Sequence, residues 1–172
     1  MTVRRLGLWA SVSLLAVALA VGLASVPAAA EGAPRYYMVA DVVRGSRNAT
    51  GPSCVQTNMF KLGEQVVWRV EVYDARTGQL LDDKSRAEEL GLKVQAEVEG
   101  VTTVPLELGP HPRQAPQVMF WAGAWEIPPV FRTGVFRWRV VVTDKEGNRA
   151  VFDPVGARRP EMPGSWLVIE RR

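Results

Sequence analysis

Residues 65–73 read QVVWRVEVY, and this stretch decides the fold class. Apolar and polar side chains alternate along it, so that Val66, Trp68, Val70 and Val72 share one face. A period of two is typical of a strand with one buried face and one solvated face. We therefore predict a β-strand here, with the tryptophan on the inner side.

The same alternation recurs on both sides of this stretch, between turns rich in glycine and proline. Seven or eight short strands separated in this way are typical of an antiparallel β-sandwich. We therefore predict an all-β chain with an immunoglobulin-like sandwich. The strands are expected at 36–43, 65–73, 92–98, 104–108, 118–127, 135–143, 149–152 and 166–170.

One short helix is expected between two of these strands. Ser85 and Glu88 have the spacing of a capping box, in which the two side chains satisfy backbone N–H groups at the start of a helix. Gly91 suits the left-handed position that ends a helix. The sequence therefore predicts one or two helical turns between Ser85 and Gly91.

The run TGVFRWRVVVTDKEGN at residues 133–148 resembles the last hairpin of bacterial immunoglobulin-like and fibronectin-like domains. Such hairpins often read threonine-glycine, then a strand with alternating aromatic residues, then an aspartate-x-x-glycine-asparagine turn. The resemblance covers the rest of the chain only through strand spacing. It implies a fold class and no particular activity, because such sandwiches carry adhesive, carbohydrate-binding, copper-handling and structural roles.

The N-terminal region has the pattern of a secretory signal peptide. Two arginines precede an uncharged apolar stretch at 6–26, and small residues lead to a cleavage position after Ala30. We expect residues 1–30 to be a helical signal segment and 31–172 to be one exported β-sandwich domain. The general secretory route would take it to the periplasm or the cell exterior, and an uncleaved segment would tether it to a membrane.

Charge argues against a nucleic-acid partner. The chain carries +3, but without Arg4 and Arg5 its 21 basic residues fall to 19 against 18 acidic ones, a net charge of +1. A nearly neutral domain lacks the basic surface that nucleic-acid binding needs. We therefore expect the partner of this domain to be a protein.

Cys54 is the only cysteine, so no internal disulfide can form. It lies in a long loop predicted over 44–63, which contains several glycines and polar residues. Outside the cytoplasm such a thiol can be a buried small hydrophobe, a covalent contact with a partner, or a ligand of copper or haem. The sequence leaves these three readings open.

A copper site would need more ligands than this thiol. Copper suits thiolate, thioether and imidazole groups, which Cys54, Met59, His111 and Met119 would supply. However, successive connections of an antiparallel meander alternate between its two ends. Cys54 and His111 are therefore expected at opposite ends of the sandwich, unless the segment around Met59 is itself a strand.

Two aromatic features are candidates for binding. Trp121 and Trp125 have the same strand parity, so both project from one face. On an exposed face they would form a platform for a sugar ring, and on the inner face they would be core. Phe131 follows two prolines in a connection and is expected to face a partner.

We predict a non-enzymatic accessory protein that needs no cofactor and binds an exported or membrane-bound protein partner. Neither the single histidine nor the single cysteine has the flanking motif of a catalytic nucleophile site. The first alternative is a redox module that binds copper or haem through its cysteine, and the second is a carbohydrate-binding module that uses two tryptophans. The candidate contact residues are Cys54, His111, Trp121, Trp125 and Phe131.

Overall fold

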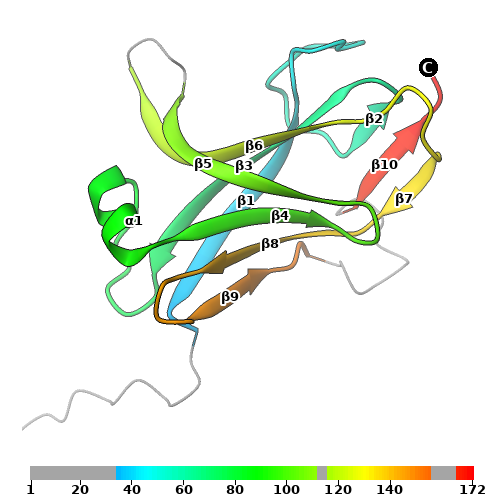
Figure 1. The fold of residues 1–172 in the computed structure, drawn as a ribbon. Coiled ribbons are helices and arrows are strands. Elements are labelled where there is room, and N and C mark those ends of the chain that lie inside the picture. Colours follow the sequence, from blue (N-terminus) through cyan, green and yellow to red (C-terminus); the bar gives the residue numbers. More distant parts are fainter. Residues whose placement is uncertain (1–33, 112–115, 156–165) are drawn as a thin grey trace, which may run out of the picture. The chain divides into compact units, whose positions relative to one another are not determined.

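The computed structural model describes residues 34–111, 116–155 and 166–172, which form ten strands and one short helix (Figure 1). The predicted signal segment at 1–30 lies outside the described residues. The elements are β1 (Tyr36–Arg44), β2 (Met59–Lys61), β3 (Gln65–Asp74), α1 (Lys84–Leu90), β4 (Lys93–Val98), β5 (Thr102–His111), β6 (Val118–Glu126), β7 (Gly134–Phe136), β8 (Trp138–Thr143), β9 (Arg149–Phe152) and β10 (Leu167–Glu170).

The strands form two sheets, so the mostly β character predicted from the alternation is confirmed. The larger sheet has the order β1-β3-β6-β5-β4-β8-β9, and every neighbouring pair in it is antiparallel. The smaller sheet has the order β2-β10-β7, in which β10 runs parallel to β2 and antiparallel to β7. The predicted count of seven or eight strands was too low, because β2 was not among the predicted strands and the run predicted at 135–143 divides into β7 and β8.

The smaller sheet arises in part because one predicted strand is divided. The alternating run at 135–143 breaks at Arg137 into β7 and β8. Before the break the chain pairs with β10, and after it the chain pairs with β4 and β9. At the corner the Arg137 carbonyl accepts a hydrogen bond from the Glu99 N–H at 3.0 Å. The chain therefore moves from one sheet to the other within the single residue between β7 and β8.

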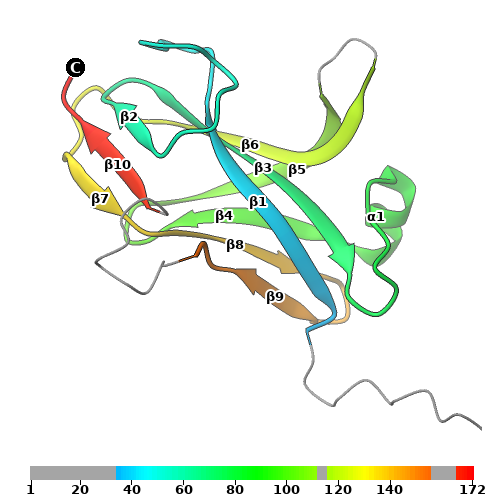
Figure 2. The same ribbon diagram turned by 180° about the vertical axis from the view of Figure 1, so that it is seen from behind.

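The larger sheet folds over on itself at β5. The first half of β5 pairs with β4, and the second half, from Glu107 onward, pairs with β6. In both views β1, β3 and β6 lie in one layer and β4, β8 and β9 in another (Figures 1 and 2). Trp68, fully buried on β3, meets Trp138 of β8 edge to face with ring centroids 6.5 Å apart. The core therefore lies between the two layers, as the inward parity of Trp68 predicted.

At Gly123 of β6 the backbone and side chains of β5 leave no room for a Cβ atom. A Cβ atom placed there would lie 2.5 Å from the Leu106 Cδ2 atom and 2.5 Å from the Pro105 carbonyl oxygen. Any larger side chain would collide with backbone as well as with a packed side chain, and backbone cannot rotate away. Glycine is therefore required for the sheet to fold over at this point.

We predict that Gly123→Ala lowers the free energy of unfolding by about 3 kcal/mol, because overpacking at a site closed by backbone forces the two strands apart. Urea titration followed by tryptophan fluorescence would measure the change. Gly109→Ala is the matched control in the same hairpin, since nothing lies within 4 Å of a Cβ atom at that position. Equal stability of the two variants would contradict a tight crossing.

The two edge strands of the larger sheet are joined by a hydrogen bond. The Tyr36 hydroxyl, at the start of β1, donates to the Asp144 carboxylate at 2.7 Å in the turn between β8 and β9. That carboxylate also accepts the backbone N–H groups of Glu146 and Asn148, both at 2.9 Å. Burial raises the pKa of Asp144, but these hydrogen bonds outweigh it and hold the pKa below its ordinary value. The predicted Asp-to-Asn turn is therefore present, and it anchors β1.

The predicted helix is present but begins earlier than expected. Asp83, and not Ser85, is the N-cap, and its side chain accepts the Arg86 N–H at 2.7 Å. Gly91 ends the helix with φ of 63°, in the left-handed region, as predicted. The helix therefore starts at Lys84, and Ser85 lies within its first turn instead of at its cap.

Candidate functional site

Cys54 lies on an exposed loop held against the end of β1. Its backbone N–H donates to the Arg44 carbonyl at 2.8 Å, and the Arg44 N–H donates to the Val55 carbonyl at 3.1 Å. The residue adopts φ of 60°, and its thiol is exposed and free. The buried interpretation of Cys54 is therefore wrong, because the segment forms only a short extension at the edge of the sheet, where the residue is exposed.

The Glu64 carboxylate anchors this loop through hydrogen bonds and an ion pair. This carboxylate is fully buried and accepts hydrogen bonds from the Thr50 N–H and hydroxyl, each at 2.7 Å, and from the Lys61 N–H at 2.8 Å. The Arg44 guanidinium forms an ion pair with it at 3.2 Å. Burial raises the pKa of Glu64, but these four interactions outweigh it and lower the pKa below the ordinary 4.5. No pattern in the sequence predicted that Glu64 would be buried and would anchor this loop.

We predict that Glu64→Gln lowers the free energy of unfolding at neutral pH by about 2 kcal/mol, since an amide cannot replace all the hydrogen bonds of the charged acceptor. Because the folded pKa is depressed, this stabilisation is present above pH 4.5 and is lost as the pH falls through the folded pKa. The difference between variant and wild type should therefore shrink in acid. Urea titrations across a pH series would measure it.

Glu126→Gln is the control for this prediction. Glu126 pairs with Arg47, and both side chains are at least half exposed. Removal of such a surface pair changes stability by less than about 0.5 kcal/mol. A pH-independent effect of Glu64→Gln, or one no larger than that of Glu126→Gln, would show that the loop is not anchored by the charge.

The four soft ligands proposed for copper are not brought together. β3 pairs Val66 with Trp125 at the Cys54 end of the sheet, whereas His111 pairs with Val118, seven residues earlier on β6. Seven residues of strand span about 23 Å. The expected separation of the cysteine and histidine loops is therefore confirmed, and Figures 1 and 2 show the two regions at different corners of the sheet.

The histidine and the second methionine also face apart. Met119 pairs with Pro110, one position away from the pair of His111 with Val118. Since successive side chains of a strand project to opposite faces, the side chains of His111 and Met119 cannot bind the same metal ion. The remaining methionine, Met59, is half exposed on β2. Within the part of the chain that the structure describes, no group of three or more His, Cys, Asp or Glu side chains could hold a metal ion.

We predict that the Cys54 thiol reacts with DTNB in native buffer at a rate close to that of the urea-unfolded chain, because nothing shields it. After incubation with Cu(I) and desalting, the protein should retain no more copper than a Cys54→Ser variant. Stoichiometric copper that disappears in Cys54→Ser would contradict this prediction and favour the redox alternative.

The predicted aromatic contacts face inward. Trp121 is buried in the core, and Trp125 is half-buried with its ring edge-on to Phe131, 5.4 Å between centroids. Phe131 in turn lies 5.5 Å from Phe136. Trp121 and Trp125 therefore form no exposed platform, and Phe131 does not face outward as expected, because these rings close one end of the core. The fully solvated residue in that connection is Val130, at 96% exposure.

The outer surface of β1, β3 and the start of β6 carries an exposed apolar cluster, which we call the β1–β3–β6 face. Tyr37, Val39 and Val118 are 44%, 55% and 54% exposed on it. On the N-terminal side of Trp121, β6 no longer pairs with β3 and pairs only with β5, and these two strand ends form an arm. A hollow of about 330 Å³ lies between this arm and the sheet. The hollow is lined by Val39, Asp41, Arg69, Val70, Glu71, His111, Val118 and Phe120.

The polar side chains of this face are fixed. The Arg69 guanidinium binds both carboxylate oxygens of Asp41, with its Nε donating at 2.8 Å, and this hydrogen bond raises the pKa of Arg69. The Tyr37 and Tyr73 rings stack with centroids 4.6 Å apart, and the Tyr73 hydroxyl donates to Glu71, which raises the pKa of Tyr73 to about 12. These side chains are therefore preorganised for contact.

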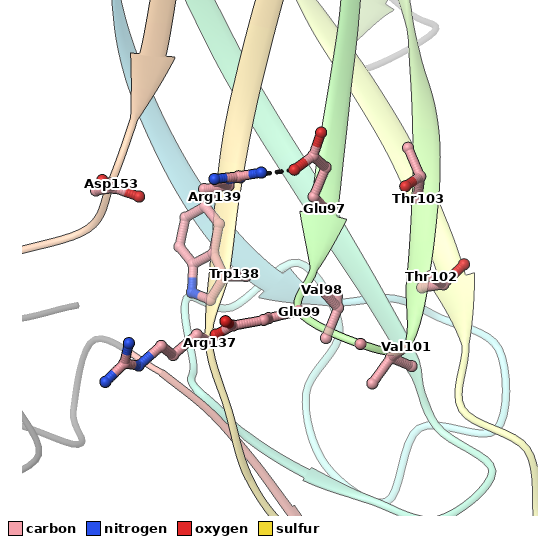
Figure 3. A pocket seen from close by; sticks show the side chains of 11 residues that line it. Glu97, Val98, Glu99, Val101, Thr102, Thr103, Arg137, Trp138, Arg139 and Asp153 are labelled. Atoms are coloured by element: carbon pink, nitrogen blue, oxygen red, sulfur yellow. Dashed lines mark hydrogen bonds and ion pairs between the residues drawn. The ribbon is translucent and has the colours of Figure 1, made fainter. Parts of the chain in front are cut away.

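A second hollow, of about 500 Å³, lies on the other layer beside the turn between β4 and β5 (Figure 3). Arg139 donates to Glu97 at 2.6 Å across its floor, and Gln95 donates to the same carboxylate at 3.0 Å. Burial raises the pKa of Glu97, but these donors outweigh it and lower the pKa. An ionised, paired carboxylate cannot serve as a general acid, so this hollow suits the binding of a polar group.

Sequence reasoning found His111 but missed the other residues of the β1–β3–β6 face. Val39, Arg69 and Phe120 lie on three strands that are far apart in the chain, and only the strand register brings them together. The one signal available was that Val39 falls on the polar parity of its predicted strand. An apolar side chain at an outward position is typical of a contact surface.

The chain matches no protein-family model, no curated protein and no solved structure. Among the described residues, no helix is long and apolar enough to cross a membrane. The function is therefore argued from the geometry of these surfaces.

Proposed function

We propose that this protein is a non-enzymatic, exported binding protein with an immunoglobulin-like sandwich, which contacts an exported or membrane-bound protein partner through the β1–β3–β6 face. The observation that carries the proposal is the placement of Val39 and Val118, both more than half exposed, on the lining of one hollow, with Tyr37 exposed on the same face of β1 as Val39. Contiguous exposed apolar side chains on a folded domain are typical of a protein interaction surface.

Strand order supports the immunoglobulin-like part of the proposal. If the seven strands of the larger sheet are lettered A to G in chain order, the sheet reads A-B-E-D followed by C-F-G. These are the two sheets of an immunoglobulin constant-type sandwich. The departure is at β5, which pairs with both β6 and β4 and so joins the two sheets into one.

The composition of the face supports a protein partner. Aromatic and aliphatic side chains lie beside the charged pair of Asp41 with Arg69, and Glu71, which accepts the Tyr73 hydroxyl, leaves the face with one net negative charge. Interface centres are typically depleted in net charge and enriched in aromatic residues. A partner surface with apolar side chains, and one polar group that meets the Asp41–Arg69 pair, would complement this face.

Export and the absence of a cofactor remain part of the proposal. The apolar stretch at 6–26 and the small residues before Glu31 support secretion to the periplasm or the cell exterior. The separation of Cys54 from His111 supports a role without copper or haem. Burial of Trp121 argues against the carbohydrate alternative built on Trp121 and Trp125.

We predict that a photo-crosslinking benzoylphenylalanine in place of Val39 yields one discrete adduct when cells expressing the protein are irradiated. Val151 provides the matched control, because it is a valine on an outward position of β9 with 37% exposure. The adduct should be absent from the Val151 position, and Val118→Asp should abolish it, since a charge on the opposite wall of the hollow disrupts an apolar contact.

Adduct mass distinguishes the outcomes. An adduct whose mass is the sum of this chain and one other polypeptide supports the proposal, and mass spectrometry identifies that polypeptide. An adduct of twice the chain mass would assign the face to self-association. Equal labelling from Val39 and Val151, or none from Val39, would overturn the proposal. Circular dichroism of each variant verifies that the fold is retained.

A further inference from the structure

A second surface, separate from the β1–β3–β6 face, lies along the free edge of β7. β7 is the last strand of the smaller sheet, and within the described residues no backbone hydrogen bond joins its other side to a neighbouring strand. A hollow of about 430 Å³ lies beside this edge. It adjoins the larger hollow of Figure 3, since Glu99 and Arg137 line both. An unpaired strand edge beside an open hollow can accept another strand.

Two arginines flank this edge on its opposite faces. The Arg132 guanidinium carbon lies 5.1 Å from the centroid of the buried Phe136 ring, on the core-facing side of β7. The Arg137 guanidinium carbon lies 5.0 Å from the centroid of the Trp166 ring. Since Phe136 and Arg137 are consecutive, the second arginine is on the outward side. Figure 3 shows the Arg137 side chain directed away from the Glu97–Arg139 pair.

Both arginines are available to an anion. Arg132 and Arg137 are exposed, and neither forms an ion pair with a carboxylate among the residues that the structure describes. Stacking on an aromatic ring leaves the planar N–H groups at the rim of each guanidinium free to donate. A carboxylate can accept two of these parallel N–H groups at once.

We propose that the β7 edge binds an extended acidic segment of a protein partner, which adds to β7 as a fourth strand of the smaller sheet and places carboxylates against Arg132 and Arg137. Successive side chains of an added strand project to opposite faces, so acidic residues at adjacent positions, or three positions apart, meet the two guanidiniums. Val135, 46% exposed between them, contacts an apolar side chain of the segment.

The positive charge of the two arginines favours an acidic segment over a second copy of the chain as the strand that pairs with β7. Two β7 edges paired with each other would bring four guanidiniums together, and like charges across paired strands are destabilising. An acidic strand replaces that repulsion with two charge-assisted contacts. Glu99, on the wall of the same hollow, is the one described carboxylate that opposes the segment, and it therefore weakens binding.

The test measures fluorescence anisotropy of the purified full chain with a labelled ten-residue peptide that carries two adjacent glutamates among serine and valine. Arg137→Gln and Arg132→Gln should each weaken binding about tenfold, the loss expected for one bidentate charged contact. Arg149→Gln, at an exposed arginine of β9, is the matched control and should change nothing. Glu99→Gln should tighten binding, which a merely destabilised protein would not do.

Further probes distinguish a strand addition from charge attraction alone. The same peptide with alternate backbone amides N-methylated should not bind, because it cannot donate along the β7 edge, and a lysine-for-glutamate peptide should not bind either. Equal binding of the N-methylated peptide, or no loss with Arg137→Gln, would overturn the proposal. Tighter binding of a heparin hexasaccharide, dependent on both arginines, would overturn it in favour of a sulfated polysaccharide. These results are independent of crosslinking at Val39, so the two proposals fail separately.

Discussion

The structure depends on the passage of β5 across β6 at Gly123. Two strands can approach this closely only where one of them has no side chain, and the approach turns one antiparallel sheet into two packed layers. The core follows from it, since Trp68 and Trp138 face each other across the fold. The surfaces follow as well, because the continuation of β5 and β6 past the crossing forms the arm that walls the hollow of the β1–β3–β6 face.

Buried and partly buried charges then fix the loops around this frame. The Glu64 carboxylate accepts backbone hydrogen bonds and forms an ion pair, and these interactions hold the loop that carries Cys54. The Asp144 carboxylate accepts a backbone N–H of its own turn and also the Tyr36 hydroxyl. A carboxylate in such a position is stabilising only because its hydrogen-bond capacity is filled. Among the described residues the two arginines beside β7 have no carboxylate partner, and this contrast with Glu64 and Asp144 is the basis of the binding role that we propose for them.

Local pattern predicted most of the larger sheet and little of the smaller one. The run at 65–73 and its counterparts are long enough for a period of two to be visible, so β1, β3, β4, β5, β6, β8 and β9 were expected near their observed positions. In the smaller sheet β10 was expected at 166–170 and β7 falls within the strand predicted at 135–143, whereas β2 has three residues, too few to show a period, and pairs with β10; that these strands form a second sheet was not expected. Asp83 displaced Ser85 as a cap because both residue types suit that position.

The candidate sites were less accessible from the sequence, because they depend on which strands become neighbours. Parity assigned Trp121 and Trp125 to the same face but could not say which face was covered. Val39 and Val118, by contrast, are far apart in the chain and meet only through β3. The arginines at 132 and 137 carry no motif, and their significance comes from the ring beneath each one and the free edge between them.

The bond from Tyr36 to Asp144 joins residues 108 positions apart. A contact of such sequence separation must overcome the entropy of closing nearly the whole domain into a loop, which makes folding slow. The first strand therefore cannot be locked in place until the last hairpin has formed. Until then β1 is held by its pairing with β3 without the bond to the turn before β9, so the chain is more open to aggregation and to capture by a chaperone during this interval.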